Sequence, residues 1–447
     1  MLNFKEVTRT YTHDEALKEA SRCLNCKVPF CKKNGCPAGL RINEFISCLK
    51  NDDVNGAYEI LMDGTNLSPI CSRVCDHRKQ CIGNCIRNKM KTQDPVHVGP
   101  LERYVMDNKT IELKPVSSWS NKKVAIIGSG PAGISCALEL VKNGIHATVF
   151  EREKHLGGVM SYGIPEYRLP KKLLNEHIEF TKRMGVSYVT EHEAIPRELL
   201  NDYDMVFIGC GLGKYKSLRI PGEDAKGVYS AGDFLKAVNM SESYGEGEGV
   251  KLEGITYVVG AGNVAMDCCR TSQRVGSSKT VVVYRRSLEE APASKDELDD
   301  AMAEGVEFNF LHNPVEIITE NGKVVAIKCE IMELGLPDES GRRSPVGSGK
   351  YEEFKCDNVL VAIGQSPDKA LTEKFGLELN SGYIVSSDGI TTSDERILAG
   401  GDIVRGADTV VRSMVDGKKA AQIMIEKLKQ YIRRNDPPYF SCFSQKK

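Results

Sequence analysis

Three stretches of the chain pass from a short apolar run, through glycines, into a helical pattern of apolar positions. This is the order of a strand, a tight turn and a helix. In residues 122–153 and 254–287 a second apolar run follows the helical part. Residues 397–428, in contrast, end within the helical part. Repeated strand–helix–strand units predict parallel sheets covered by helices. We therefore expect an α/β fold for most of the chain.

The first stretch carries a complete dinucleotide-binding fingerprint. Its turn reads G-x-G-x-x-G, and its second strand ends at Glu151. Such glycines let the backbone approach a pyrophosphate at a helix N-terminus, and an acid about twenty residues further on accepts ribose hydroxyls. The predicted site comprises Gly128, Ser129, Gly130, Pro131, Ala132, Gly133, Glu151 and Arg152.

The second stretch has a related turn but a different strand end. Gly260, Gly262 and Ala265 form the G-x-G-x-x-A variant, and the strand after the helix ends in YRRS instead of an acid. Arginines and a hydroxyl are donors for a 2′-phosphate, which favours NADPH over NADH. The alternative is a pair of arginines that are merely solvated at a strand end. The predicted site comprises Gly260, Ala261, Gly262, Asn263, Val264, Arg285, Arg286, Ser287 and Gly364.

The two strand ends together predict two Rossmann-like domains, one for a flavin dinucleotide and one for NADPH. The third stretch supports the flavin, because Gly401 and Asp402 follow an apolar strand and precede a helix. In two-dinucleotide flavoproteins an aspartate at this place binds the ribityl chain, and the N-terminus of the next helix faces the flavin ring. We add Gly401, Asp402, Thr409 and Val410 to the predicted FAD site.

Cysteine is concentrated at the other end of the chain. Nine of the sixteen cysteines lie at or before Cys85. A chain of 447 residues does not need disulfide staples, and zinc sites usually join two C-x-x-C pairs a dozen or more residues apart. The run C-x2-C-x4-C-x4-C-P instead approximates a ferredoxin arrangement, in which the fourth thiolate reaches a second cluster. Two quartets are present: Cys23, Cys26, Cys31 and Cys36, then Cys71, Cys75, Cys81 and Cys85.

These quartets predict two [4Fe–4S] clusters. Closely spaced thiolates on one loop can wrap only three corners of a cubane, so the fourth ligand must come from elsewhere. We expect the first cluster on Cys23, Cys26, Cys31 and Cys85. The second would take Cys36, Cys75, Cys81 and one further ligand, for which the thiolate of Cys71 is a chemically suitable candidate. Cys48, Cys268 and Cys269 are expected to pack in the core.

Composition mainly excludes partners. The chain has 60 Lys and Arg against 61 Asp and Glu, so neither nucleic acid nor an anionic membrane is indicated. The N-terminus has no apolar signal-peptide core, and no apolar run approaches the roughly 18 residues that span a bilayer. We expect a cytoplasmic protein with reduced cysteines.

The ordered motifs resemble the small (β) subunit of NADPH-dependent glutamate synthase over essentially the whole chain. They are the eight cysteines, GSGPAG, IPEYRLPK, GAGNVAMD, YRRS, VAIGQSPD and GGD. The N-terminal region of dihydropyrimidine dehydrogenase and a subunit of ferredoxin:NADP bifurcating enzymes are similar. The resemblance implies a mostly helical iron–sulfur domain at residues 1–116, an FAD domain at 117–230 and 365–447, and an NADPH domain inserted at 231–364.

The resemblance also bears on single residues. It adds Gly158, Val159 and Arg168 to the FAD site, and it implies Glu102, within GPLERY, as the eighth cluster ligand in place of Cys71. One departure is that KKNG, residues 32–35, gives four residues between the third and fourth cysteines where three are common. We expect these residues to bulge at the surface, where the lysines would meet an acidic partner.

The implied function is electron transfer. NADPH gives hydride to FAD, and FAD converts this pair into the single electrons that clusters accept, so no catalytic acid, base or nucleophile is needed. The expected partner is a larger subunit such as that of glutamate synthase, or ferredoxin, in a homo- or hetero-oligomer. The alternative is a stand-alone NADPH reductase of ferredoxin, quinones, iron or small electron-poor compounds. The FAD fingerprint has no C-x4-C beside it, so a disulfide reductase is not indicated.

Overall fold

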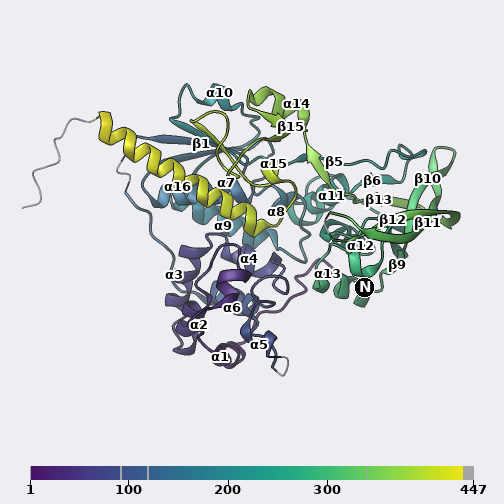
Figure 1. The fold of residues 1–447 in the computed structure, drawn as a ribbon, viewed down its shortest axis with the longest axis horizontal. Coiled ribbons are helices and arrows are strands. Elements are labelled where there is room, and N and C mark those ends of the chain that lie inside the picture. Colours follow the sequence, from purple (N-terminus) through teal and green to yellow (C-terminus); the bar gives the residue numbers. More distant parts are fainter. Residues whose placement is uncertain (1, 91–92, 118–119, 340, 436–447) are drawn as a thin grey trace, which may run out of the picture.

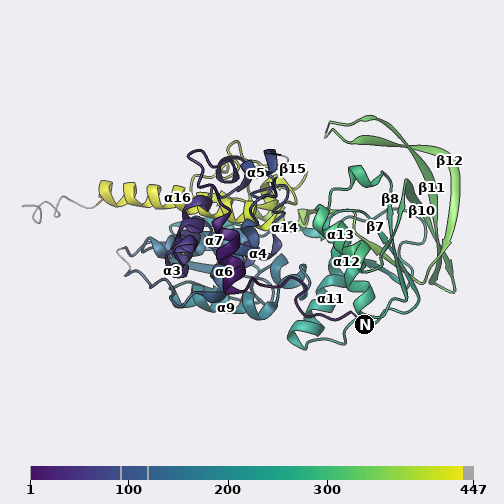
Figure 2. The same ribbon diagram turned by 90° about the horizontal axis from the view of Figure 1, so that it is seen from below.

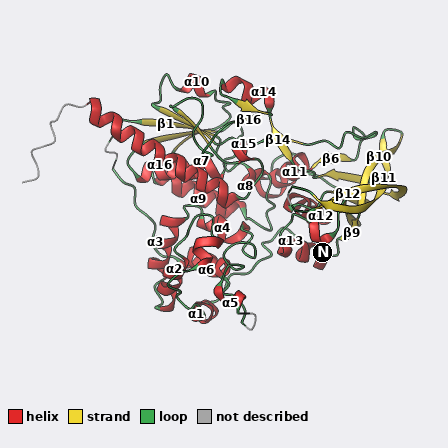
Figure 3. Cartoon of the chain, in the orientation of Figure 1, coloured by secondary structure: helices red, strands yellow, loops and turns green. Residues whose placement is uncertain are grey.

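The structure is a computed structural model that describes residues 2–90, 93–117, 120–339 and 341–435. It has three parts: a helical N-terminal domain and two domains that are each built on a parallel sheet (Figure 1). Figure 3 shows that helices dominate the first part, whereas strands gather in the other two. The expected fold class is confirmed.

The helical domain consists of short helices joined by the loops that carry the cysteines. The first helix begins at Thr12, whose side chain accepts a hydrogen bond from the Glu15 amide, while the Glu15 carboxylate accepts one from the Thr12 amide. This reciprocal cap fixes the chain direction shortly before Cys23. The elements are α1 (His13–Ser21), a π-helical turn (Cys31–Gly35), α2 (Ile42–Lys50), α3 (Val54–Gly64), α4 (Ser68–Val74), α5 (Ile86–Lys89) and α6 (Val98–Asn108).

The first sheet has the strand order β17-β4-β1-β2-β3, and all of its pairs are parallel. Alternate residues of β1 face opposite layers: Val124 and Ile126 join the cluster with the long helices, while Ala125 and Ile127 join the cluster on the other face. The strands are β1 (Lys123–Ile127), β2 (His146–Phe150), β3 (Ser187–Val189), β4 (Met205–Ile208) and β17 (Ile397–Ala399). The helices are α7 (Pro131–Lys142), α8 (Val159–Tyr162), α9 (Lys171–Arg183), α10 (Pro196–Leu199), α15 (Asp402–Arg405) and α16 (Val410–Asn435).

The second sheet, ordered β6-β13-β7-β8-β9, is also parallel throughout. Helices cover one face and an antiparallel three-stranded sheet, β10-β11-β12, covers the other. The parallel strands are β6 (Val228–Ser230), β7 (Ile255–Val259), β8 (Lys279–Tyr284), β9 (Glu307–Phe310) and β13 (Asn358–Val361). The remaining elements are α11 (Ala231–Tyr244), α12 (Asn263–Arg274), a 3-10 turn (Leu288–Glu290), α13 (Lys295–Ala303), β10 (His312–Glu320), β11 (Lys323–Pro337) and β12 (Arg343–Lys355).

Two antiparallel strands, β5 (Gly213–Tyr215) and β14 (Gln365–Pro367), carry the chain out of the first sheet domain and back into it. The second sheet domain is therefore an insertion. β6 lies just before residue 231 and belongs to the second sheet, and the domain limits given above remain proposals. The returning segment forms α14 (Lys369–Thr372), a 3-10 turn (Glu373–Phe375), β15 (Leu379–Asn380) and β16 (Tyr383–Ile384).

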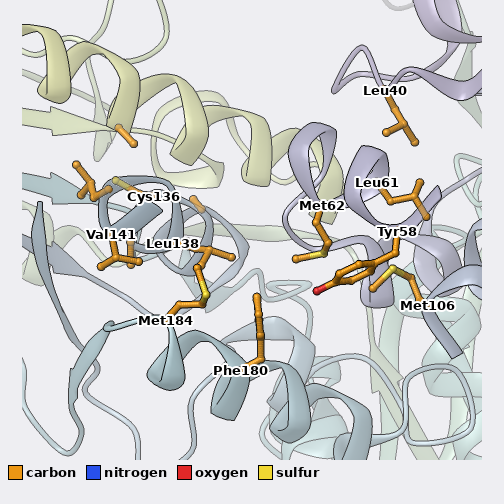
Figure 4. Packing of buried hydrophobic residues seen from close by; sticks show 14 of the residues in the cluster. Leu40, Tyr58, Leu61, Met62, Met106, Cys136, Leu138, Val141, Phe180 and Met184 are labelled. Carbon is orange, nitrogen blue, oxygen red and sulfur yellow. The ribbon is translucent and has the colours of Figure 1, made fainter. Parts of the chain in front are cut away.

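The helical domain and the first sheet domain share one apolar cluster. Figure 4 shows Leu61 and Met62 of α3 on one side of it, and Leu138 of α7 with Phe180 of α9 on the other. The Asn66 side chain also donates a hydrogen bond to the Ser135 carbonyl across this boundary, at 3.1 Å. The two domains are thus packed as one body.

Among the described residues, the cysteines are all free thiols. No helix in the described part of the chain is long and apolar enough to cross a membrane.

Candidate functional site

The first cysteine group lines a small pocket in the helical domain. Cys23, Cys26, Cys31 and Cys85 surround it together with apolar side chains such as Phe30. Burial, together with the neighbouring Cys85 thiol, raises the pKa of Cys31 to about 11. Four thiols gathered among apolar side chains, and not joined as disulfides, fit a [4Fe–4S] cluster, which would hold them as thiolates. The structure brings together the four residues that the sequence assigned to the first cluster.

The second group gathers around Glu102. Burial, with smaller contributions from the nearby Glu102 carboxylate and Cys75 thiol, raises the pKa of Cys36 to about 11. Burial likewise raises the pKa of Cys81, again with contributions from Cys75, Glu102 and Cys36. Cys36, Cys75, Cys81 and Glu102 are therefore close enough to influence one another's ionisation.

Glu102 is an unusual carboxylate. It lies on α6, it is 5 % exposed, and its Oε1 atom has no hydrogen-bond partner among the described residues. Burial raises the pKa of Glu102 to about 7. A buried carboxylate oxygen without a partner is costly unless something binds it. An iron ion at this point would satisfy it.

The thiol of Cys71 is hydrogen-bonded to that of Cys75, but it also belongs to an apolar cluster with Leu67 and Ile70 of its own helix. Both candidates for the eighth ligand therefore lie beside the second group. Within the described ranges, no three His, Cys, Asp or Glu side chains converge tightly enough to hold a single metal ion.

The KKNG segment forms the π-helical turn, which the Cys36 amide closes by donating to the Cys31 carbonyl at 2.8 Å. Lys33 and Asn34 are exposed, as expected for a surface bulge. Gly35 is not: a Cβ there would lie 2.8 Å from the Gln80 carbonyl oxygen. The bulge points outward, but its end is packed against the loop of the second group.

The first nucleotide turn is tightly packed at two of its glycines. Gly128 has φ +97°, and a Cβ there would lie 2.7 Å from the Gly209 carbonyl oxygen. At Gly133 a Cβ would lie 1.8 Å from the Gly128 carbonyl oxygen, so α7 approaches β1 too closely for any side chain. At Gly130, in contrast, the nearest atom to an added Cβ is 3.9 Å away. The open side of the turn is the one expected to face a pyrophosphate.

Glu151, which is predicted to bind the ribose, also stabilises this turn. Its Oε2 accepts hydrogen bonds from the Ser129 amide at 2.9 Å and from the Ser129 hydroxyl at 2.6 Å. The Ser129 hydroxyl also accepts from the Gly157 amide at 2.9 Å, which ties in the loop before Gly158. Val159, at the start of α8, is 45 % exposed. An exposed apolar residue beside an open turn is suited to contact with a bound cofactor.

The C-terminal part of the predicted FAD site lies where α16 begins. Burial raises the pKa of Asp402 to about 6, and the Ser413 hydroxyl donates to its carboxylate at 3.2 Å. The Thr409 hydroxyl is buried and has no partner among the described residues. Like Glu102, it is a polar atom for which a bound group would supply the missing hydrogen bond.

The predicted FAD residues and the second cysteine group meet in one apolar cluster. It contains Met160 of α8 and Val411 of α16, and Val74 and Cys75 pack against it from the helical domain. The first cysteine group lies further away, near α1 and α5 at the opposite end of that domain (Figure 1). The structure therefore orders the three predicted sites in space.

The second nucleotide turn repeats the features of the first. Gly260 has φ +125° and lies against the Ala362 carbonyl, whereas a Cβ on Gly262 would meet nothing closer than Pro292, at 3.8 Å. Asn263 accepts a hydrogen bond from the Ser294 amide, and Val264 is 36 % exposed. Gly364, with φ +110°, lies where the chain leaves this domain.

The residues at the strand end that was predicted to bind a 2′-phosphate have different surroundings. Arg285 is exposed and has no partner among the described residues. Arg286 is buried, and it pairs with Asp338 at 2.7 Å and donates to the Arg343 carbonyl at 2.8 Å. The Ser287 hydroxyl donates to Glu290 at 2.5 Å. Arg343, which no sequence motif singled out, lies beside Ser287.

Arg168, for which the FAD site stays a prediction, forms ion pairs that join the two sheet domains. Its guanidinium lies 2.8 Å from Asp267 of α12 and 2.8 Å from Glu297 of α13. Its charge is thus engaged by two carboxylates of the inserted domain. The partners are about a hundred positions away in sequence, so no local pattern indicated this pairing. Cys268 and Cys269 are buried in the helical layer as expected, while Cys48 is only partly buried.

Comparison with known proteins agrees with this architecture. Residues 1–113 match the family described as dihydropyrimidine dehydrogenase domain II, 4Fe-4S cluster, and residues 122–417 match pyridine nucleotide-disulphide oxidoreductase. Among solved structures, Mycobacterium tuberculosis FprA in complex with NADPH has a TM-score of 0.59 at 22% identity, covering 70% of this chain and 86% of that one. Lactococcus lactis thioredoxin reductase has a TM-score of 0.53 at 20% identity, covering 70% and 100%. At this identity the two structures indicate a shared fold only.

Sequence relatives define the family. The chain is 37% identical to the glutamate synthase [NADPH] small chain of Escherichia coli over 446 residues, covering 94% of this chain and 93% of that one. The corresponding chain of Halomonas elongata is 36% identical, covering 95% and 93%. The NADPH-Fe(3+) oxidoreductase subunit beta of Geobacter sulfurreducens is 33% identical, covering 90% and 64%. The chain belongs to the family of glutamate synthase small chains and is an oxidoreductase with an N-terminal 4Fe-4S domain and a pyridine-nucleotide oxidoreductase domain.

Proposed function

We propose that this chain is the electron-input subunit of an NADPH-dependent enzyme with FAD and two [4Fe–4S] clusters. When bound, FAD supplies the change from two-electron hydride chemistry to the one-electron chemistry of the clusters. The residues of the two glycine turns would hold the nucleotides. The first cysteine group, which includes Cys85, would hold one cluster. The second group, completed by Glu102, would hold the other. Relatives that are named as subunits of larger oxidoreductases support this assignment.

The observation that carries the proposal is the apolar cluster shared by Cys75 and the starts of α8 and α16. It places the second cysteine group beside the predicted FAD residues, and the first group beyond it. A flavoprotein that passed its electrons directly to a small acceptor would not need a chain of sites leading away from the flavin. The spatial order supports an exit through the helical domain.

The surface over the first cysteine group favours a protein acceptor over a small one. Leu24 and Val28 on the cysteine loop are 53 % and 56 % exposed. Lys27 and Lys33 are exposed nearby, and the Lys89 ammonium lies 4.5 Å from the centre of the Phe30 ring. Exposed apolar side chains within a basic rim suit an acidic partner protein. The free cysteines are compatible with a reducing compartment, and we propose that the protein works in the cytoplasm.

The test replaces single cluster ligands rather than removing the helical domain, because removal would expose the apolar cluster shared with the first sheet domain. Cys85→Ser and Glu102→Gln should each cost about four of eight irons while FAD stays bound. NADPH-dependent dye reduction should persist, since a dye can take electrons from flavin. Transfer to the co-purified native partner should fall to near background in both variants.

Cys71→Ser is the matched control, because it changes a buried thiol of the same group without removing a proposed ligand. It should keep both clusters. If Cys71→Ser loses a cluster and Glu102→Gln does not, the eighth ligand is Cys71. Full transfer to the partner by both ligand variants would reject the proposed route and leave the stand-alone reductase as the better description. Glutamate formation by this chain alone would also contradict the proposal.

A further inference from the structure

The hairpin formed by β11 and β12 folds back onto the end of β8. The Arg286 side chain binds the hairpin through two contacts. Its Nε donates to the Arg343 carbonyl at 2.8 Å, and its Nη2 lies 2.7 Å from an Asp338 carboxylate oxygen. Arg286 is only 7 % exposed. Its guanidinium is therefore already hydrogen-bonded to the hairpin.

The side chain of Arg343 returns toward the strand end. Its Nε lies 2.5 Å from Glu290, and its Nη2 lies 2.8 Å from Glu289 and 3.4 Å from the Ser287 hydroxyl. Its Nη1 group has no hydrogen-bond partner among the described residues. The hairpin thus delivers a second guanidinium to the place where the sequence predicts a 2′-phosphate, next to the exposed Arg285.

We propose that Arg343, together with Arg285 and Ser287, contacts the 2′-phosphate of NADPH, and that Arg286 is a positioning residue that acts through Arg343. This inference rests on the proposed use of NADPH. A phosphate dianion is bound best by guanidinium groups that offer two N–H donors each, and both Arg285 and Arg343 have donors to spare.

The three acids at this place are consistent with that role. Asp338 is paired with Arg286, and Glu290 receives the Ser287 hydroxyl and Arg343. Glu289 is 83 % exposed, so it can leave Arg343 when a phosphate arrives. A bound phosphate would replace Glu289 on Nη2 and use the open Nη1 group.

The test measures binding of 2′,5′-ADP and 5′-AMP to the FAD-loaded protein by calorimetry, so that no turnover is needed. The two ligands differ only in the 2′-phosphate. Arg343→Ala should weaken 2′,5′-ADP binding by about tenfold or more, as expected for one charge-assisted contact, and leave 5′-AMP binding unchanged. Arg286→Ala should have a similar effect. The double variant should be no weaker than Arg343→Ala, because Arg286 acts through Arg343.

Lys350→Ala is the control for charge alone. Lys350 is exposed on the same strand, seven residues from Arg343, or about 23 Å along an extended chain. Its replacement should change neither ligand's affinity. Arg343→Lys keeps the charge and is the fallback if the alanine variant loses FAD or unfolds, and it should still weaken 2′,5′-ADP binding measurably.

Unchanged 2′,5′-ADP affinity in Arg343→Ala and Arg343→Lys would overturn the role of Arg343. Additive losses in the double variant would overturn the positioning role of Arg286 and make it a direct ligand. If the unmodified protein does not distinguish 2′,5′-ADP from 5′-AMP, the proposed NADPH preference fails together with this inference. A failure of this inference alone leaves that discrimination intact.

Discussion

Two glycines of the first nucleotide turn are glycine for different physical reasons. Gly133 lacks room, since a Cβ would lie 1.8 Å from the Gly128 carbonyl oxygen. Gly130 has φ −67°, which any residue adopts, and its nearest neighbour to an added Cβ is 3.9 Å away. The fold alone therefore requires glycine at Gly133 but not at Gly130. What requires it at Gly130 is the close approach of a pyrophosphate.

The two alanine variants should consequently behave differently. Gly133→Ala should destabilise the apoprotein by about 3 kcal/mol or more, because α7 has to move away from β1. Gly130→Ala should leave the melting temperature of the apoprotein nearly unchanged but lose most of its bound FAD. Thermal unfolding and flavin absorbance after purification measure both effects. Stoichiometric FAD in a stable Gly130→Ala protein would contradict the position assigned to the cofactor.

At this scale the sequence indicated residue types better than residue partners. Glu151 lies at the first glycine turn as predicted, and the four cysteines of the first pocket lie together as predicted. Each of these motifs is local or has a recognisable spacing. Arg168 was assigned from the family resemblance and Arg286 from the strand-end motif, yet carboxylates 99 and 52 residues away bind them. Such pairings depend on how domains dock, which a local pattern does not contain.

Residues 2–9 form a segment that has no regular secondary structure. This segment runs from the helical domain to the inserted domain (Figure 2). Phe4 packs on the helical layer beside α12, and Arg274 of that helix donates to the Asn3 carbonyl at 2.9 Å. Glu6 pairs with Arg73 of the helical domain at 2.9 Å. The segment is thus a strap that ties the two domains together.

Truncating the Phe4 side chain, which attaches the strap to the inserted domain, should reduce the local stability of that domain. Phe4→Ala should cost about 1–3 kcal/mol of local stability, because it removes a partly buried aromatic ring. Amide hydrogen exchange in α12 should become faster, while exchange in α3 stays unchanged. Val7→Ala is the control, because Val7 belongs to the same strap but is 45 % exposed. Equal exchange in Phe4→Ala and the unmodified protein would show that the strap does not hold the domain.

Elements with a periodic pattern were accessible from the sequence, and the strap was not. The parallel strands of both nucleotide-binding units are short continuous apolar runs, and their helices follow the 3.6-residue apolar period. Residues 2–9 have neither pattern, and the contact of the partly buried Phe4 ring forms only once the inserted domain is in place. The β11–β12 hairpin is similar, since its function depends on the strand end onto which it folds.

At the scale of the whole molecule, the cysteine loops and the nucleotide turns are mechanically connected. Arg78, between Cys75 and Cys81, lies 2.5 Å from Asp296 at the start of α13. The neighbouring Lys79 ammonium lies 3.4 Å from the Pro292 carbonyl oxygen, and Pro292 lies next to Gly262 of the second turn. The inserted domain therefore rests on the loop of the second cysteine group as well as on Arg168 and the strap.

We propose that this one body holds one FAD and two [4Fe–4S] clusters. The most direct measurement is the content of iron, acid-labile sulfide and FAD in the protein after anaerobic purification. We expect about eight irons and eight sulfides per FAD, because two cubanes are required by the two cysteine groups. About four irons per FAD after anaerobic reconstitution would show that the protein holds only one cluster. Zinc in place of iron would contradict both proposed clusters.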